Sequence, residues 1–276
     1  MLNGTRFVLV SPARSGSTVL RNTLNAHPEV ICHGEILDRN RILGLVHNPA
    51  VTLSGIELYQ LRKECIKDFV YSQILVAPSA VKAVGFKALY YHFGEIQFAE
   101  AIQMLIECKD IKMIFLWRRN LVDRYLSEVQ HRMEAALKTK PVTVTLEEVA
   151  QDCRNQLSSG AIIGSMLSDH TCITVCYEDL VSDSRTTLQR ITALLGVDPG
   201  IIELPEKRES PADTQNRNLI QRLAGKLVGA DTHTPGRCKR RYLLIENEQL
   251  VREAAELDCY RNHEPPAAWN RKPVTT

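Results

Sequence analysis

The chain alternates short apolar runs with longer segments of helical periodicity, and this alternation constrains its fold more than any other feature. Short apolar runs predict strands at 7–10, 30–32, 81–86, 112–117 and 171–177. Helical spacing predicts helices around 19–27, 56–75, 121–137 and 186–195, and a last one near 246–257. Strands that alternate with helices are typical of an α/β fold, in which a central parallel sheet is flanked by helices on both faces.

The size and composition fit a soluble globular chain. With 276 residues, 44% of them hydrophobic and 24% charged, the chain is long enough for one large domain, and no linker divides it. We therefore expect a single domain over 1–276, with an irregular and partly helical C-terminal part from about 200. The net charge of +2 favours no nucleic-acid partner, so any phosphate site has to come from basic residues that cluster locally.

Cysteine usage and the length of the apolar runs bear on the compartment. The eight cysteines are scattered without a C-x-x-C pair, which favours free thiols in a reducing cytoplasm. The N-terminal segment lacks the pattern of a signal peptide, and no window approaches the roughly 18 apolar residues of a membrane span. We therefore expect a cytoplasmic protein without a transmembrane segment, and peripheral contact with a membrane stays open.

A glycine-containing loop joins the first predicted strand to the first predicted helix, where residues 11–18 read SPARSGST. The first N–H groups of a helix lack intrahelical partners and the helix dipole is positive there, so this context favours an anion site. Gly16 lets the backbone close around phosphate oxygens, and Arg14 can pair with two anionic oxygens at once. Further hydroxyl donors are Ser15, Ser17 and Thr18. An ordinary strand–turn–helix connection is the alternative interpretation.

The loop lacks the lysine and the second glycine of a Walker A motif, which argues against a kinase or ATPase that binds a Mg-nucleotide. Instead, residues 11–20 resemble the 5′-phosphosulfate loop of sulfotransferases that use 3′-phosphoadenosine-5′-phosphosulfate (PAPS). The loop arginine is similar to that of bacterial and Golgi-type carbohydrate sulfotransferases, whereas the cytosolic small-molecule group usually has lysine. The resemblance implies a sulfotransferase fold with a P-loop-like anion site. It assigns to the cofactor Arg14, Ser15, Gly16, Ser17, Thr18 and Val19.

A second basic segment follows the fourth predicted strand. Residues 115–127 read FLWRRNLVDRYLS, so the strand delivers Arg118 and Arg119 to the start of a helix. In sulfotransferases an arginine at the strand end and a serine eight residues later hold the 3′-phosphate of the cofactor, and Arg119 and Ser127 have this spacing. The second arginine of the family's R-D-P-R is displaced, and Arg118 or Arg124 would replace it. The alternative is a solvated helix face flanked by surface arginines.

Three further segments resemble sulfotransferase motifs more loosely. Tyr177 opens a Y-E-D-L segment, and the resemblance puts it near the adenine; the alternative is a core tyrosine. Lys87 closes a G-F-K segment at the end of a predicted strand, where it would approach the sulfuryl group or the acceptor, unless it is a surface lysine. A late basic run would cover the 3′-phosphate side of the cofactor, or else form a solvated turn. Its basic residues include Arg237, Lys239 and Arg240.

The segment 32–37, which reads CHGEIL, holds the candidate general base. Glu35 follows the second predicted strand, so it should emerge at the same sheet edge as the anion loop, and the resemblance to carbohydrate sulfotransferases implies a catalytic glutamate there. His33 is the competing candidate, by analogy with the histidine base of cytosolic sulfotransferases. Arg14, which would neutralise developing charge, and Lys87 complete the expected catalytic group. No second ligand pair accompanies His33, so no metal is expected.

Together these features predict an enzyme that moves the sulfuryl group of PAPS in line to a hydroxyl, with adenosine 3′,5′-bisphosphate (PAP) as the product. The loop arginine and Glu35 favour a carbohydrate or glycolipid acceptor. Two other functions stay open: a P-loop-type nucleotide kinase or NTPase, and a non-catalytic nucleotide-binding protein. Thermal stabilisation by PAP rather than by ATP with Mg²⁺ would separate the sulfotransferase from the kinase.

Overall fold

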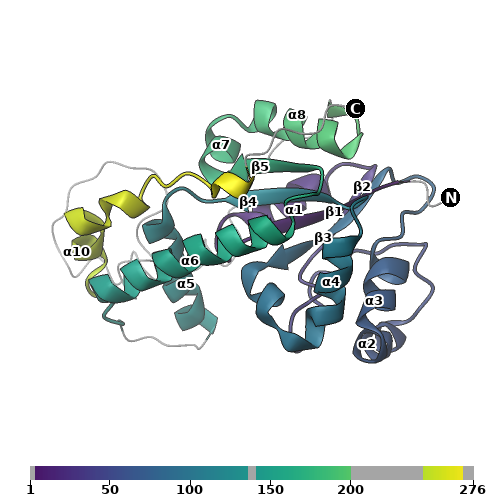
Figure 1. Ribbon diagram of the computed structural model, residues 1–276, viewed down its shortest axis with the longest axis horizontal. Helices are drawn as coiled ribbons and strands as arrows, with labels where there is room; N and C mark the ends of the chain where they lie inside the picture. The colour runs from purple at the N-terminus through teal and green to yellow at the C-terminus, as the bar shows by residue number, and fades with distance from the viewer. Residues whose placement is uncertain (1–3, 136–140, 200–244, 270–276) are drawn as a thin grey trace, which may run out of the picture.

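The computed structural model describes residues 4–135, 141–199 and 245–269. In these residues a five-stranded parallel sheet runs through the centre, in the order β2-β3-β1-β4-β5 (Figure 1). The strands are β1 (Thr5–Ser11), β2 (Val30–His33), β3 (Ala83–Leu89), β4 (Lys112–Trp117) and β5 (Cys172–Cys176). Because β1 lies between β3 and β4, its carboxyl end opens where the chain crosses from one half of the sheet to the other, the usual ligand position in such sheets.

Helices cover both faces of the sheet, which confirms the predicted α/β fold with a parallel sheet. One face packs against α1 (Ser17–Leu24), α7 (Tyr177–Ser182) and α8 (Ser184–Leu195). The other face packs against α2 (Gly55–Glu64), α3 (Ile66–Asp68), η1 (Phe69–Ile74), α4 (Ala99–Glu107), α5 (Leu121–Ala135) and α6 (Leu146–Met166). Side chains of β1 alternate between the faces: Phe7 and Leu9 join the first cluster, Val8 and Val10 the second.

The last described segment packs back onto the sheet. It contains α10 (Glu248–Glu253) and the 3₁₀ turns η6 (Ala255–Tyr260) and η7 (Ala267–Trp269). The buried Trp269 ring stacks on Phe115 of β4 with 4.6 Å between ring centroids, and its indole N–H donates to the Gly160 carbonyl of α6 at 2.9 Å. The segment is therefore joined to the core that carries β4.

Several predicted boundaries were wrong. The single helix expected over 56–75 is divided at Cys65, whose φ of −147° leaves the helical region, and it continues as α3 and the π-helix η1. This change of direction buries Phe69 and Val70 fully in the core. The helix expected over 246–257 breaks at the extended Ala254.

Two strand ends also differ from the prediction, with consequences for residues of the candidate site. The strand expected over 81–86 runs from Ala83 to Leu89, so Lys87 lies within β3 and not at its end. The strand expected over 171–177 ends at Cys176, and Tyr177 begins α7. Lys87 is therefore buried, and the alternative of a surface lysine is wrong.

Candidate functional site

The loop between β1 and α1 has the geometry of an anion site. Its last residue, Gly16, is the N-cap of α1 with φ 89° and ψ 10°, and no side chain caps the helix there. The first turn of α1 contains no acidic residue, so the positive end of the helix dipole is not neutralised within the helix. The Ser15 hydroxyl donates to the Pro12 carbonyl at 2.7 Å, which closes the loop on itself. The first N–H groups of α1 are therefore left for a bound anion.

Gly16 and Tyr177 fit against each other. A Cβ atom at Gly16 would lie 2.4 Å from the Tyr177 ring, so the loop passes this close to α7 only because residue 16 has no side chain. The Arg118 guanidinium lies over the Tyr177 ring, 5.1 Å from the ring centroid. The structure thus brings Tyr177 and Arg118 next to the anion loop.

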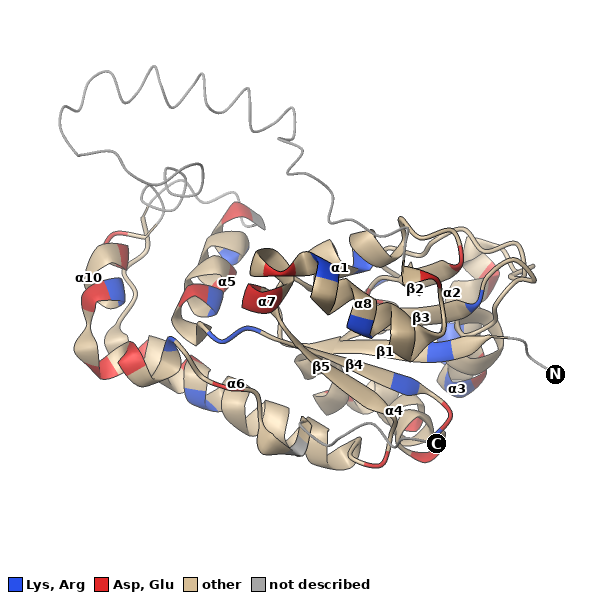
Figure 2. Ribbon diagram, turned by 90° about the horizontal axis from the view of Figure 1, so that it is seen from above, with Lys and Arg blue, Asp and Glu red and all other residues tan. Residues whose placement is uncertain are grey.

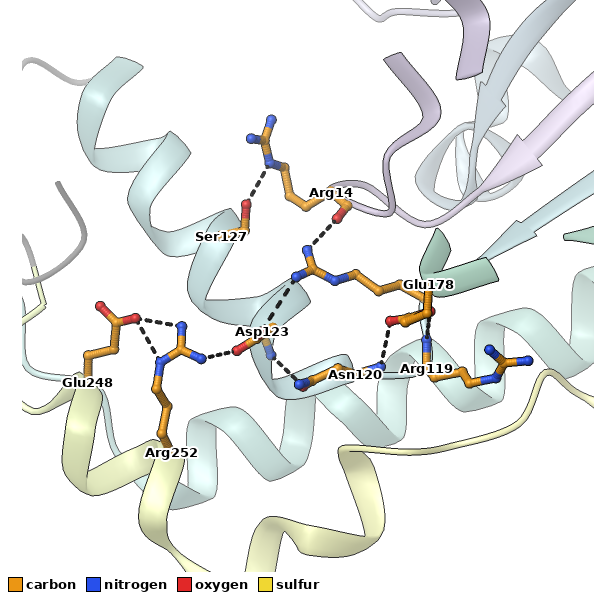
Figure 3. Close-up of polar contacts among 9 residues, drawn as sticks. Arg14, Arg119, Asn120, Asp123, Ser127, Glu178, Glu248 and Arg252 are labelled. Carbon is orange, nitrogen blue, oxygen red and sulfur yellow. Dashed lines mark hydrogen bonds and ion pairs between the residues drawn. The ribbon is translucent and has the colours of Figure 1, made fainter. Parts of the chain in front are cut away.

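Two arginines from the second basic segment hold the backbone of the loop. Arg118 Nη1 donates to the Arg14 carbonyl at 3.1 Å, and Arg124 Nη1 donates to the Ala13 carbonyl at 3.2 Å. Arg14 needs such support because its φ of 64° is left-handed, a conformation that costs a non-glycine residue energy. The Arg14 side chain reaches the other way, and its Nε donates to Ser127 Oγ at 3.3 Å (Figure 3). Arg14 and Ser127, which the sequence resemblance assigns to opposite ends of the cofactor, are therefore in direct contact.

Arg119 does not join this group in the structure. Its guanidinium forms a two-bond pair with Asp179, at 2.6 and 3.0 Å, and its Nε donates to Glu264 at 3.1 Å. In Figure 3 the Arg119 side chain points away from Arg14 and Ser127. Its acidic partners come from α7, where Figure 2 shows acidic residues, and from the C-terminal segment. The prediction that Arg119 and Ser127 hold one phosphate thus requires Arg119 to exchange these partners.

A second group of polar side chains meets at the first turn of α1. The Lys87 ammonium lies 2.8 Å from Glu35 Oε1 and 3.4 Å from the Thr18 hydroxyl oxygen. The Tyr91 hydroxyl donates to Glu35 Oε2 at 2.8 Å. Each residue follows or belongs to a different element: Glu35 follows β2, Lys87 lies in β3 and Tyr91 lies in η2 (Tyr90–Gly94). The predicted base therefore lies beside the anion loop.

Opposing effects set the charge of Glu35. Partial burial of the carboxyl would raise its pKa, but the hydrogen bond and the charge of Lys87, together with the Tyr91 hydroxyl, lower the pKa below its ordinary value. Glu35 is consequently ionised at neutral pH and can accept a proton. Its lowered pKa makes it a weaker base than an isolated glutamate.

His33, the competing candidate base, lies in a different environment. Its side chain is fully buried, and its Nδ1 accepts a hydrogen bond from the Val46 N–H at 3.1 Å. Burial lowers the pKa of His33 to about 4, so the ring is neutral at pH 7. The ring holds the backbone of the following loop, whereas Glu35 two residues later contacts Lys87 beside Thr18.

Tyr91 was missed by sequence reasoning, although a signal was present. It follows the carboxyl end of β3, the strand that carries Lys87, and side chains after parallel strands gather at one sheet edge. Tyr91 also lines a cavity of about 520 Å³ beside the loop residue Ala13. The residue that binds Glu35 therefore lines an open space large enough for a small molecule.

Some predictions lie beyond the described residues or concern absences. Arg237, Lys239 and Arg240 lie outside the described residues. Among the residues that are described, no cluster of His, Cys, Asp and Glu could hold a metal ion, and the seven cysteines there are free thiols. In the same part of the chain no helix combines the length and the apolar character needed to cross a lipid bilayer.

The chain was compared with known proteins in three ways. No curated protein matches the chain. Solved structures with a similar fold include a sulfotransferase from Alicyclobacillus acidocaldarius, with 15% identity, a TM-score of 0.45 and coverage of 82% of this chain and 96% of that one. A mouse sulfotransferase, SULT7A1, complexed with PAP has 15% identity, a TM-score of 0.40 and coverage of 86% and 73%. The sulfotransferase domain of the Synechococcus PCC 7002 olefin synthase has 19% identity, a TM-score of 0.39 and coverage of 91% and 95%.

The amino-acid sequence itself decides the family. Residues 7–199 match the model of the sulfotransferase family, and this range is more than half of the chain. It contains the anion loop, Glu35, Lys87, the second basic segment and Tyr177. The chain therefore belongs to the sulfotransferase family, and it is a sulfotransferase enzyme.

Proposed function

We propose that this sulfotransferase transfers the sulfuryl group of PAPS in line to a hydroxyl of a carbohydrate or glycolipid, with Glu35 as the general base. One observation carries the proposal. Glu35 and Lys87, which are 52 positions apart, form an ion pair of 2.8 Å, and Lys87 reaches the first turn of α1 through Thr18. The candidate base and the candidate anion loop therefore share one edge of the sheet, which supports an in-line transfer there.

The residues of the loop fit the anionic end of PAPS. The N-terminus of α1 has no side-chain cap and no acidic residue in its first turn. The Arg14 side chain extends beside it and meets Ser127. When bound, PAPS would supply an activated sulfuryl group, with PAP as its leaving group. Arg14 and the loop amides would neutralise charge on the transferring oxygens, and Ser127 would hold the phosphate at the other end of the nucleotide.

Tyr177 and the arginines after β4 complete the proposed nucleotide site. Tyr177 would lie along the adenine, and Arg118 already contacts both its ring and the loop. Arg119 would bind the 3′-phosphate by leaving Asp179 and Glu264, because a phosphate offers the same two-bond geometry as a carboxylate. The late basic residues Arg237, Lys239 and Arg240 would cover that phosphate.

The acceptor hydroxyl would bind beside Glu35. The carboxylate would take its proton, and Lys87 would keep the carboxyl oriented toward the anion loop. His33 stays the weaker candidate, since its ring nitrogen is engaged by the backbone of Val46. Removal of the proton at the moment of attack contributes typically 10²–10⁴-fold to the rate.

The cavity next to Tyr91 supports a neutral acceptor. Its charged lining residues form pairs with each other: Arg124 contacts Asp152, and Arg132 Nε lies 3.6 Å from Glu128. The lining therefore has no excess charge, and it combines aromatic side chains such as Phe93 with polar ones. A sugar or the head of a glycolipid, which presents hydroxyls without a charge, fits such a lining better than an ionic acceptor.

We further propose that the chain acts as one domain over 1–276, in the cytoplasm, without a metal ion. Its partners would be PAPS and the hydroxyl acceptor, without nucleic acid. The lysine and second glycine that a Mg-nucleotide P-loop requires are missing from residues 11–18, which supports PAPS over ATP.

Calorimetric titration with PAP and transfer assays with labelled PAPS test this function. The wild type should bind PAP and not ATP with Mg²⁺, and it should label members of a panel of neutral glycans and glycolipids. Arg14→Ala and Arg119→Ala should each weaken PAP binding, because each loses a guanidinium for an anionic oxygen. Glu35→Gln should leave PAP affinity within about twofold and lower transfer by at least tenfold, because the amide accepts no proton.

Glu107→Gln is the matched control, since it makes the same chemical change at an exposed carboxylate at the end of α4. It should leave both PAP binding and transfer unchanged. Preference for ATP with Mg²⁺ would instead identify a kinase or NTPase. PAP binding without transfer to any acceptor would identify a non-catalytic nucleotide-binding protein, and full transfer by Glu35→Gln would assign the base to another residue.

A further inference from the structure

The C-terminal segment 245–269 lies outside the range that matches the sulfotransferase family, yet it contacts the residues that follow β4. The His263 N–H donates to the Arg119 carbonyl at 3.1 Å, and the Trp117 indole N–H donates to the His263 carbonyl at 2.8 Å. The backbone that presents Arg118 and Arg119 is therefore held from the C-terminal side.

A chain of alternating charges extends this contact to the anion loop (Figure 3). Arg252 of α10 pairs with Glu248, at 2.7 and 2.9 Å, and also with Asp123 in the first turn of α5. Asp123 Oδ2 lies 3.7 Å from Arg118 Nη2. Arg118 in turn donates to the Arg14 carbonyl at 3.1 Å. Three contacts thus join α10 to the loop: Arg252 with Asp123, Asp123 with Arg118, and Arg118 with the backbone carbonyl of Arg14.

The charges in this chain balance. The participants carry, in order, a negative, a positive, a negative and a positive charge: Glu248, Arg252, Asp123 and Arg118. Without Arg252 the same group would carry a net negative charge beside the proposed nucleotide site. Asp123 would then repel an anion and draw the mostly buried Arg118 away from the loop carbonyl of Arg14.

The loop needs Arg118 in a fixed place. Arg14 has a left-handed φ of 64°, and the guanidinium of Arg118 on its carbonyl is one of the contacts that hold this conformation. The other contact comes from Arg124, which binds the preceding carbonyl and pairs with Asp152 of α6. Each of the two bracing arginines is therefore positioned by a carboxylate, and only the carboxylate of Asp123 is shared with the C-terminal segment.

From this geometry we propose that Arg252 is a positioning residue of the anion site, which neutralises Asp123 and thereby leaves Arg118 on the loop carbonyl of Arg14. The C-terminal segment then helps to position the residues of the proposed nucleotide site. This inference rests on the proposed function, because the expected ligand is PAP.

Calorimetric titration of the full chain with PAP tests the inference. Arg252→Met, which keeps an unbranched side chain of similar length but loses the charge, should weaken PAP binding at least fivefold. Arg252→Lys should restore most of the affinity, because it returns a positive charge to Asp123. The matched control is Lys109→Met, which removes one positive charge from an exposed pair with Asp169 at the amino end of β4, and it should bind PAP as the wild type does.

A charge-rescue experiment separates positioning from a merely structural role. Asp123→Asn in the Arg252→Met background should recover PAP affinity to within about twofold of the wild type, because it removes the carboxylate that Arg252 neutralised. A merely structural role of Arg252 would predict that the double variant loses still more PAP affinity and has a lower melting temperature. Unchanged affinity in Arg252→Met, or no rescue by Asp123→Asn, would overturn the inference. Failure of the wild type to bind PAP would overturn the proposed function itself and this inference with it.

Discussion

At the scale of single residues, the most informative group is Glu35 with its two partners. The carboxylate is only about 20% exposed, and such burial would by itself raise its pKa. Lys87 and Tyr91 lower the pKa of Glu35 by more than burial raises it, so the carboxyl stays ionised to a lower pH than an isolated glutamate. For a carboxyl whose folded pKa is lowered, the ion pair stabilises the fold above the unfolded pKa and this contribution is lost as the pH falls through the folded pKa. Activity that depends on ionised Glu35 should likewise be lost as the pH falls through the pKa of Glu35 in the folded protein.

Replacement of Lys87 should expose the effect of burial. In Lys87→Met the pKa of Glu35 should rise, because the opposing charge is gone and burial remains. The acid limb of the pH profile of kcat/KM should therefore move to higher pH, by about one pH unit or more, where one unit corresponds to about 1.4 kcal/mol. Steady-state rates between pH 4 and 8 measure it.

Lys82→Met provides the control for Lys87→Met, because Lys82 forms a more exposed pair with Glu29. Its acid limb should coincide with that of the wild type. If the limb of Lys87→Met also stays in place, Glu35 is not the group whose ionisation limits the reaction at low pH.

At the scale of elements, the loop between β1 and α1 has a backbone that only its sequence permits. Gly16 takes a left-handed φ and leaves room for the Tyr177 ring of α7. The existence of most elements was predictable from apolar runs, and so was this loop. The helices α4 and α6 were not singled out, although Thr145 and Glu148 form a capping box at the start of α6 that the sequence pattern T-x-x-E would have indicated.

Gly16→Ala should disrupt this element in two ways. Its Cβ would lie 2.4 Å from the Tyr177 ring, and the left-handed φ would be strained in alanine by about 1–3 kcal/mol. We expect a lower melting temperature and PAP binding weakened at least tenfold, as measured by calorimetric titration.

Gly55→Ala is the control for this change. Gly55 begins α2, and an added Cβ there meets nothing within 4 Å. That variant should keep its PAP affinity and its melting temperature should not fall. A Gly16→Ala variant that binds PAP as tightly as the wild type would show that the loop backbone does not need its left-handed geometry.

At the scale of the whole molecule, the C-terminal segment is tied to the centre of the sheet. Trp269 lies within the aromatic group formed with Phe115, Trp117 and Tyr90. This packing supports the positions of α10 and of the residues that contact Arg118 and Arg119. The stability of the core and the integrity of the proposed nucleotide site are therefore coupled.

Trp269→Ala should measure this coupling. Loss of a buried tryptophan in a packed core costs about 3–5 kcal/mol, so the free energy of unfolding should fall by roughly this amount in urea titrations. Trp269→Phe keeps an aromatic ring against Phe115 and loses the hydrogen bond to Gly160 and part of the ring volume, so its free energy of unfolding should fall less. Equal losses in both variants would mean that the ring contributes little to the attachment of the segment.

The sequence by itself determined the parallel α/β fold, the anion loop at residues 11–18 and the placement of Glu35 beside it, because apolar periodicity and strand-to-helix turns are local patterns. Only the tertiary structure decided the partners of the charged residues. It paired Lys87 with Glu35, directed Arg119 to Asp179 and Glu264, and joined Arg252 to Asp123. The physical reason is that an ion pair depends on which side chains the folded sheet and helices bring within a few ångströms, and residues far apart in the chain carry no local signal of that distance.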